Sequence, residues 1–358
     1  MKNRKSAVSS ALAAFAMLVI ILDTKTALFG ANDGVQLCIR TVIPSLFPFF
    51  VLSGIINSQL LGRSVRLLRP VCKLCRISAG AESLLLLGFL AGYPVGAQMI
   101  TQAYKQGKLS KNTAKRMLGF CNNAGPAFLF GMLSPLFVNP VVPWTLWGIH
   151  ILSACIVGFL LPSQEDSICE IAKAEPITLP QALQNAVKIM AAVCGWVVLF
   201  RILLGFCERW FLWRFPKELQ VLFCGLLELA NGCVMLKQLP LVGMQFTMAS
   251  VLLSFGGLCV GMQTCTATEG LGTGYYFPGK ALQTSLSLLL SLMVQPLLFS
   301  KENQLCMSIF HFLSIAALTG FILVYLHRKK VVAINRKMLY NIGNKQEGGT
   351  TTCCSERK

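Results

Sequence analysis

Charged side chains are scarce in this sequence. Aspartate, glutamate, lysine and arginine together make up 13% of the 358 residues, and only 14 residues are acidic. With 54% apolar residues and a mean hydropathy of +0.64, the composition excludes an ordinary soluble domain. It is typical of a chain that crosses a membrane several times.

Signatures of catalysis are missing as well. The sequence has no G-x-x-x-x-G-K-[ST] phosphate loop and no H-E-x-x-H zinc motif, and its three histidines are isolated. Cys72 and Cys75 have metal-ligand spacing, but no second cysteine pair or histidine lies near them. No nucleophile, base and orienting partner can be assembled from spacing, so little favours an intramembrane enzyme. We expect no enzymatic activity, no metal and no cofactor.

Basic residues outnumber acidic ones and give a formal net charge of +18. In a soluble protein this charge would suggest a nucleic-acid partner. Here the bases flank apolar segments, which is the pattern that keeps loops on the cytoplasmic side during membrane insertion. Insertion explains the charge, so no nucleic-acid partner is expected and both termini are predicted to be cytoplasmic. The basic patches are residues 2–5, 63–76, 105–116 and the tail beyond Tyr325.

Apolar runs of about 20 residues, which cross about 30 Å of hydrocarbon, predict the membrane spans. The first run resembles a signal peptide but lacks a convincing cleavage site, so we expect an uncleaved anchor. Two further apolar segments, 81–104 and 219–239, are interrupted by glycine, proline or polar residues. Two of the spans are also predicted to be broken, at 122–126 and at 254–257. Eight runs are predicted to span the membrane: 7–22, 42–61, 118–138, 141–161, 182–204, 240–262, 281–299 and 305–326.

The segment 81–104 is predicted to be a re-entrant hairpin. If it crossed the membrane, the basic loops on its two sides would lie on opposite faces, against the charge rule. A hairpin broken at Gly92 and Pro94 keeps both loops cytoplasmic. Counting crossings from a cytoplasmic N-terminus, the second hairpin, around Asn231, enters from the opposite face. This arrangement predicts an inverted repeat.

The predicted fold class is an all-α polytopic membrane protein with about eight transmembrane helices and two re-entrant hairpins. A weak internal similarity supports the repeat, because the run from Gly88 to Gly96 resembles the run from Gly225 to Gly232. The predicted organisation is an anchor helix at 1–34, repeats at 35–162 and 181–300 joined by an acidic linker at 163–180, a final helix at 301–327 and a basic cytoplasmic tail at 328–358.

Helix breaks inside a membrane leave backbone groups that lipid cannot satisfy, so they persist only against protein or a wet cavity. Exposed helix ends, asparagine amides and a buried carboxylate would suit a small polar solute. The candidate substrate-binding residues are Gly92, Tyr93, Pro94, Gly96, Asn122, Asn123, Gly125, Pro126, Glu228, Asn231, Gly232, Ser254, Gly256 and Gln263.

Each polar candidate also has a structural interpretation. An acidic side chain in an apolar segment marks an ion or substrate site by default, but Glu228 could instead face water at the hairpin mouth or pair with Arg201. Asn122 and Asn123 could bind solute or only join neighbouring helices. Tyr93 could stack on a ring-shaped ligand or simply pack beside the break. Gln263, at the end of a span, could complete a polar cluster or face water.

Three runs carry a resemblance to a known family. These are PSLFPFF from Pro44, GYPVGA from Gly92 and FCNNAGPAF from Phe120. In this order and spacing they resemble the YlbJ family of sporulation integral membrane proteins, over about residues 35 to 300. The second half, with the ELANG run from Glu228 and the SFGGL run from Ser254, fits more loosely. The resemblance implies a nucleoside-recognition or Gate domain, a name that does not identify a ligand.

The resemblance implies a multi-pass protein in the cell membrane of a spore-former, with a role during sporulation. With the candidate residues, the resemblance also implies a permease-like protein that binds or moves a small polar solute, nucleoside-like or other, with a coupling ion as a further candidate partner. The alternative is a structural or assembly factor for the spore envelope. Besides the lipid bilayer, a second copy of the chain or other sporulation membrane proteins are candidate partners.

Overall fold

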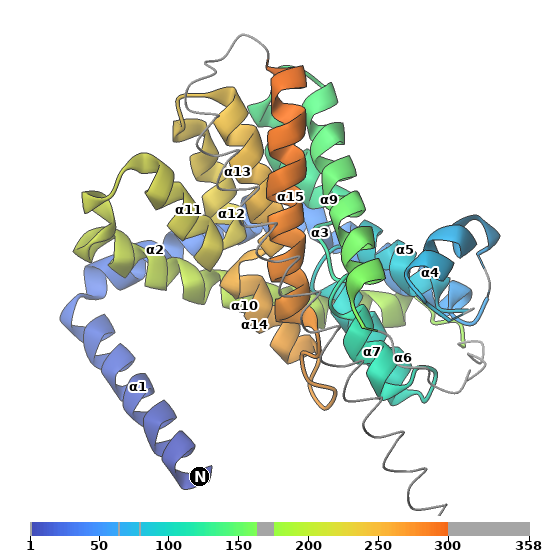
Figure 1. The fold of residues 1–358 in the computed structure, drawn as a ribbon. Coiled ribbons are helices and arrows are strands. Elements are labelled where there is room, and N and C mark those ends of the chain that lie inside the picture. The colour runs from blue at the N-terminus through green and yellow to red at the C-terminus, as the bar shows by residue number, and fades with distance from the viewer. Residues whose placement is uncertain (1, 64, 79, 163–174, 300–358) are drawn as a thin grey trace, which may run out of the picture. The chain divides into compact units, whose positions relative to one another are not determined.

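The protein is described from a computed structural model that places residues 2–63, 65–78, 80–162 and 175–299, with side chains from residue 10 onward. The chain divides into two compact units, Met1–Glu302 and Asn303–Lys358. The described helices all belong to the first unit (Figure 1). Within the described ranges every regular element is a helix. The predicted eighth span at 305–326, the final helix at 301–327, the tail and most of the linker at 163–180 fall outside the described residues.

A long helical run opens the first half after α1 (Lys2–Leu22). Asp23 caps α2 (Thr24–Leu37), because its carboxylate accepts a hydrogen bond from the Thr26 amide at 3.2 Å. Helix α2 continues through the π-helical turn η1 (Cys38–Val42) into α3 (Ile43–Leu60), which makes 37 helical residues in a row. This run passes through residue 34, where the predicted anchor segment ends.

Shorter helices then lead to the second long helix of this half. The apolar run 118–138 is not one continuous helix, because residues 122–125 are non-helical and helical structure resumes only at Pro126. The predicted span at 118–138 is thus interrupted where its polar cluster lies. The elements are η2 (Arg66–Leu68), α4 (Arg69–Leu74), α5 (Glu82–Leu90), α6 (Val95–Lys105), α7 (Lys111–Met117), α8 (Pro126–Phe128), η3 (Leu129–Leu133), η4 (Ser134–Leu136) and α9 (Val141–Leu160).

The second half opens with another long helix. Thr178 and Gln181 form a capping box at the start of α10 (Leu179–Trp210), which fixes where the helix begins. The other elements are η5 (Leu212–Arg214), α11 (Lys217–Leu227), α12 (Leu229–Met235), η6 (Leu236–Gln238), α13 (Val242–Phe255), α14 (Gly257–Ala267) and α15 (Tyr276–Leu298).

Five helical runs in the described ranges are long and apolar enough to cross a membrane, which supports a multi-pass membrane protein. The predicted count of eight crossings is not confirmed. The run at 7–22 corresponds to a shorter apolar helix, Ser10–Leu22, and the run at 118–138 to another, Pro126–Leu136. The five long runs are Thr24–Leu60, Val141–Leu160, Leu179–Trp210, Val242–Ala267 and Tyr276–Leu298.

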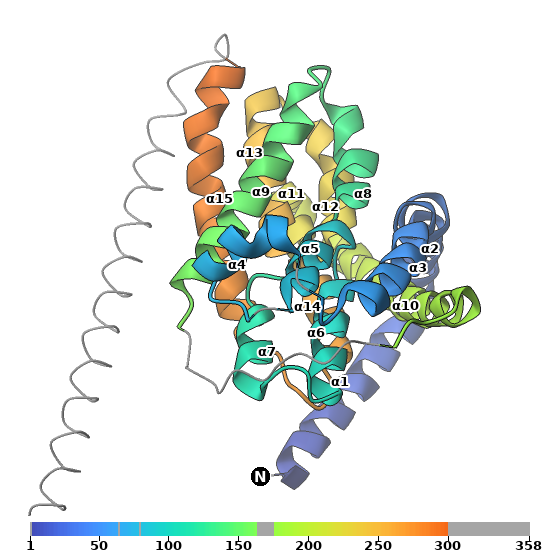
Figure 2. The same cartoon turned by 90° about the vertical axis from the view of Figure 1, so that its right-hand side faces the viewer.

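Two groups of helices run in different directions. Helices α9, α13 and α15 stand side by side, and α10 packs along α2 and α3, lying across that direction in both views (Figures 1 and 2). Two sets of helices that cross steeply cannot both follow the membrane normal. The length and apolarity of the five runs therefore do not determine how many of them cross the membrane.

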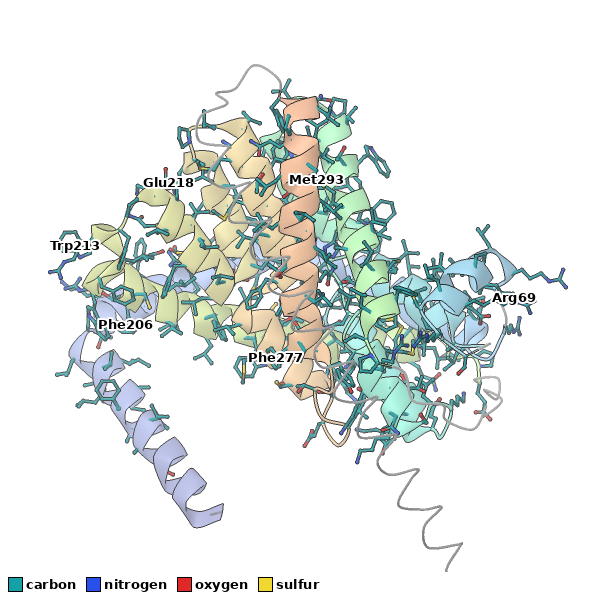
Figure 3. All side chains as sticks on the ribbon, in the orientation of Figure 1. Arg69, Phe206, Trp213, Glu218, Phe277 and Met293 are labelled. Carbon is teal, nitrogen blue, oxygen red and sulfur yellow. The ribbon has the colours of Figure 1, made fainter. Side chains whose placement is uncertain are left out.

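Large apolar side chains lie on the outside of the helices. Trp213 on η5 and Met293 on α15 are each 62% exposed, and Trp213 lies at the outer edge of the helices (Figure 3). Inside, by contrast, the buried groups include many polar side chains. An apolar exterior around a partly polar interior fits a protein surrounded by lipid.

Candidate functional site

Four helix breaks lie together at the centre of this unit. The first separates α5 from α6 at Gly92, and the second is the non-helical stretch that ends at Gly125 before α8. The third separates α11 from α12 at Glu228, and the fourth separates α13 from α14 at Gly256. The sequence-based prediction that these apolar segments are interrupted is confirmed at all four positions.

In each half the break in the hairpin touches the break in the following segment. A Cβ atom built on Gly92, whose φ is +80°, would lie 3.0 Å from the Gly125 nitrogen. In the second half, a Cβ on Gly257 would lie 3.2 Å from the Leu229 nitrogen. The two halves meet at Tyr93, because a Cβ on Gly256 would lie 3.7 Å from the Tyr93 ring. The four breaks thus form one continuous region, which we call the break cluster.

Two glycines allow the first hairpin to close on the second break. Gly88 on α5 and Gly96 on α6 both approach the backbone carbonyl of Cys121 so closely that a Cβ atom on either would overlap its oxygen. Helices with side chains at these positions could not approach this backbone. Cys121 is itself fully buried.

Asn122 joins the first hairpin to the second half. Its Oδ1 accepts a hydrogen bond from the Ala97 amide at 3.2 Å, near the start of α6. Its Nδ2 donates to the Thr264 hydroxyl on α14 at 3.0 Å. Asn122 is fully buried, so its amide ties three segments together, as the structural interpretation proposes.

Asn123 contacts a buried lysine that the sequence analysis did not single out. The Lys280 ammonium on α15 donates to Asn123 Oδ1 at 3.0 Å and to Gln283 Oε1 at 2.8 Å. Gln283 Nε2 also donates to Asn123 Oδ1, at 3.0 Å. Lys280 is 1% exposed, and none of the ion pairs among the described residues includes it. Its hydrogen-bond acceptors are therefore amide oxygens rather than a carboxylate.

His150 on α9 links the second break to the fourth. The Ala124 amide donates to its Nε2 at 3.1 Å, so Nε2 carries no hydrogen and Nδ1 is the donor. Nδ1 faces the Ser254 hydroxyl at 3.4 Å. From Ser254 the donors continue to Ser287 at 2.6 Å, to Ser153 at 2.8 Å and back to the His150 carbonyl at 3.0 Å. This closed ring of hydrogen bonds holds α9, α13 and α15 together.

Glu228 is the N-cap of α12. Its carboxylate accepts hydrogen bonds from the Ala230 amide at 3.1 Å, the Asn231 amide at 2.7 Å and the Asn231 side chain at 2.6 Å. It is 3% exposed, so it does not face water. Nor does it form an ion pair with Arg201, which binds Asp33 at 3.0 Å and Glu208 at 3.1 Å. The carboxylate stabilises the positive end of a helix inside the protein.

Tyr93 is the one candidate in the break cluster with an unused polar atom. Its hydroxyl is buried and has no hydrogen-bond partner among the described residues. Tyr93 also lies within electrostatic range of Glu228 and Cys233 in the second hairpin. A buried hydroxyl without a partner costs free energy, and this one lies at the junction of two hairpins.

The remaining candidates occupy backbone or local positions. Pro94 caps α6 and Pro126 begins α8, while Gly232 on α12 lies against Gly225 on α11. Gln263 is buried and donates to the Cys259 sulfur at 3.4 Å, so it neither faces water nor bonds to the Asn123 network. In the described ranges, no group of three histidine, cysteine or acidic side chains could hold a metal ion.

Lys280, Gln283, Ser287 and His150 were not among the predicted site residues. A signal for the first three was present, because 280, 283, 287 and 291 repeat at helical spacing as Lys, Gln, Ser and Ser along an apolar helix. The predicted span at 281–299 excluded Lys280 as a flanking base. His150 gave no local signal, since its partners are far away in the sequence.

Comparison with known proteins shows a similarity to a sporulation membrane protein. The chain is 23% identical over 294 residues to the sporulation integral membrane protein YlbJ of Bacillus subtilis (strain 168), which covers 70% of this chain and 72% of that protein. This supports the resemblance to the YlbJ family. No family model matches the chain. No solved structure matches it either.

Proposed function

We propose that the protein is a sporulation-associated, permease-like membrane protein in which the break cluster binds a small polar solute. The observation that carries this proposal is the buried, unpartnered Tyr93 hydroxyl at the point where both broken hairpins meet. Broken helices that meet inside a membrane protein are a recurrent way to build a solute site. The similarity to YlbJ supports the link to sporulation.

The arrangement of helices supports two equivalent halves. Each half has a long helix, a broken hairpin, a broken segment and a further long helix. Helix α3 packs on α10 and α9 packs on α15, so corresponding helices pair with each other. Helix α6 of the first hairpin packs on α14, and α12 of the second packs on η3. This reciprocal exchange is what an inverted repeat with a central site would produce.

Native cysteines provide the test. We expect a chain that keeps only Cys233, at the break cluster, to react with a membrane-impermeant methanethiosulfonate in proteoliposomes. A chain that keeps only Cys224 is the matched control, because Cys224 lies in the same hairpin but packs against Leu204 and Leu212. Both cysteines are buried, at 1% and 0% exposure.

A site that opens to water should make Cys233 react at least about tenfold faster than Cys224. This ratio corresponds to a free energy of local opening that is about 1.4 kcal/mol lower. Equal protection of Cys233 and Cys224 from both sides of the membrane would contradict the proposal. The reaction is followed by the mass shift of the intact protein.

A structural or assembly role is the second candidate function. It is favoured by the other polar side chains of the break cluster, because Asn122, Asn123 and Glu228 form their hydrogen bonds with other groups of the protein. In a spore-forming host, this role predicts that Tyr93→Phe sporulates normally and that combined Arg63→Gln and Arg66→Gln substitutions in the exposed loop reduce sporulation. The permease-like role predicts instead that Tyr93→Phe reduces sporulation and that the two arginine substitutions together leave it normal.

A further inference from the structure

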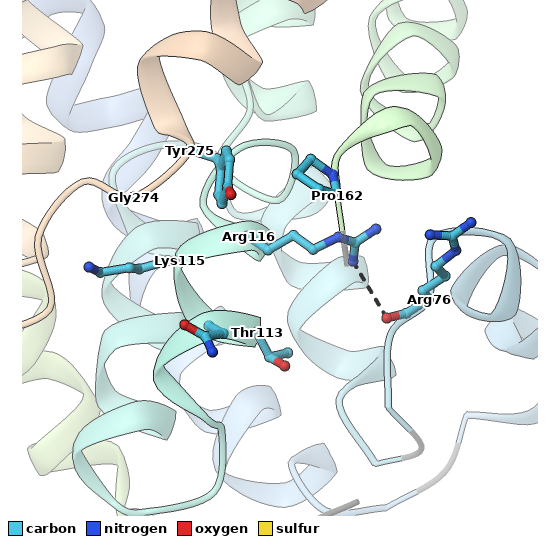
Figure 4. Close-up of a pocket in the computed structure, with 8 residues that line it drawn as sticks. Arg76, Thr113, Lys115, Arg116, Pro162, Gly274 and Tyr275 are labelled. Atoms are coloured by element: carbon cyan, nitrogen blue, oxygen red, sulfur yellow. Dashed lines mark hydrogen bonds between the residues drawn. The ribbon is translucent and has the colours of Figure 1, made fainter. Parts of the chain in front are cut away.

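A basic pocket lies apart from the break cluster, where α9 ends and α15 begins. Its volume is about 300 Å³, at the small end of ligand pockets. It is lined by side chains or backbone of Arg76, Thr113, Lys115, Arg116, Pro162 and Tyr275, among others (Figure 4). The pocket lies at one end of two candidate spans, and the end of a span is where a membrane meets water.

Arg116 on α7 is built into the wall of this pocket. Its Nε donates to the Leu161 carbonyl at 3.3 Å, and its other nitrogens donate to the carbonyls of Gly158 and Arg76. Gly158 and Leu161 stand at the C-terminal end of α9, whose negative dipole end favours a cation. The guanidinium carbon also lies 5.4 Å from the centre of the Phe120 ring. Arg116 is 4% exposed, so its position is fixed by the fold.

Charge in the pocket is of one sign. Arg76, Lys115 and Arg116 contribute to the lining. Among the described residues the lining includes no acidic side chain, and none of the ion pairs there involves these bases. Arg116 has five N–H hydrogens, and its bonds to the three carbonyls engage each nitrogen once, which leaves further hydrogens for a ligand. A buried guanidinium without a carboxylate partner is costly unless an anion approaches it.

The open side of the pocket adds donors suited to an oxyanion. Arg76 and Arg116 lie on the same side of α7, and the Tyr275 hydroxyl points toward Arg116 (Figure 4). Tyr275 is also the N-cap of α15, so the positive end of that helix borders the pocket. Two guanidinium groups beside a helix N-terminus match the geometry of a tetrahedral, multiply charged oxyanion better than that of a neutral solute.

We propose that this pocket binds a phosphate group, carried either by an anionic lipid or by a small soluble molecule. The Tyr275 amide donates to the Lys115 carbonyl at 3.0 Å, so α7 and α15 already touch at the pocket. A phosphate bound there would further join α7, the end of α9 and the start of α15. The full chain should therefore be stabilised by the ligand.

The test compares Arg76→Gln with Arg66→Gln in the purified full-length protein. Arg66 is an exposed arginine of the same loop that does not line the pocket, so both variants lose one equal charge. Thermal unfolding in a zwitterionic detergent is followed with inorganic phosphate against chloride at equal ionic strength. In a second arm it is followed with added phosphatidylglycerol against phosphatidylcholine.

We expect the parent chain and Arg66→Gln to gain about 2–4 °C in melting midpoint, and Arg76→Gln to gain less than half as much. A gain with phosphate identifies a soluble ligand, and a gain with phosphatidylglycerol alone identifies a lipid headgroup. The proposal fails if neither ligand stabilises the parent chain, or if both variants respond alike. Tyr275→Phe is the second variant should Arg76→Gln not fold; it removes only the hydroxyl and should reduce the gain in the same direction.

Discussion

Gly88→Ala is expected to destabilise the protein by about 3 kcal/mol. The added methyl group would overlap the Cys121 carbonyl oxygen, which is backbone and cannot rotate away as a side chain could. Helix α5 would have to move away from the second break, and with it the contact between Gly92 and Gly125. The measurement is the midpoint of unfolding of the purified protein in detergent, monitored by tryptophan fluorescence.

Gly148→Ala is the matched control. Gly148 lies within α9, and a Cβ atom there would have no heavy atom within 4 Å. Alanine has the higher helix propensity by about 1 kcal/mol in water, so this variant should be neutral or slightly more stable. If Gly88→Ala proves as stable as Gly148→Ala, the close packing of the first hairpin on the second break is wrong.

Asn123→Ala should cost about 3 kcal/mol for a different reason. It removes one of the two acceptors that stabilise the buried Lys280 ammonium, and it also removes an acceptor for Gln283. The surrounding helices leave little room for water, since Asn123, Lys280 and Gln283 are all almost fully buried. The loss is therefore the cost of a poorly compensated buried charge rather than of one neutral hydrogen bond.

A double-mutant cycle separates the charge from the other bonds of Asn123. In the Lys280→Met background the ammonium is absent, so Asn123→Ala should cost at least about 1.5 kcal/mol less than in the parent chain. Unfolding midpoints of the four proteins give this coupling. Additive effects of the two substitutions would show that Lys280 and Asn123 are not energetically coupled, and would contradict the described network.

These two predictions concern the framework of the break cluster, while the cysteine experiment concerns its use. A solute site between broken helices requires a rigid framework that holds these helices in place. Lys280 and Asn123 join α15 to the second break, and the ring through His150 joins α9 to α13 and α15. Buried hydrogen bonds of this kind restrict which helices can move relative to one another.

Much of the local structure followed from residue type. Gly92 and Pro94 interrupt an apolar run and predicted a break between two helices, which the structure has between Leu90 and Val95. Gly256, with its φ of +83°, ends α13 where the sequence placed a break. Glycine and proline act through the backbone of their own segment, so their effects can be inferred without knowing the fold.

Partners of the polar side chains did not follow from residue type. Glu228 was open to three interpretations, and the structure adds a fourth, the capping of α12. Asn123 and Lys280 are 157 residues apart, and Asn122 and Thr264 are 142 apart. No local pattern links residues at such separations.

The sequence by itself determined that this is a helical membrane protein with interrupted apolar segments, because composition, charge distribution and helix breakers are properties of single segments. Only the tertiary structure decided that the four breaks meet, that a lysine without a carboxylate lies beside them, and that two arginines face one pocket at the end of α9. These features arise from packing between distant helices. A side chain in a membrane protein acquires its role from the groups that other helices bring to it.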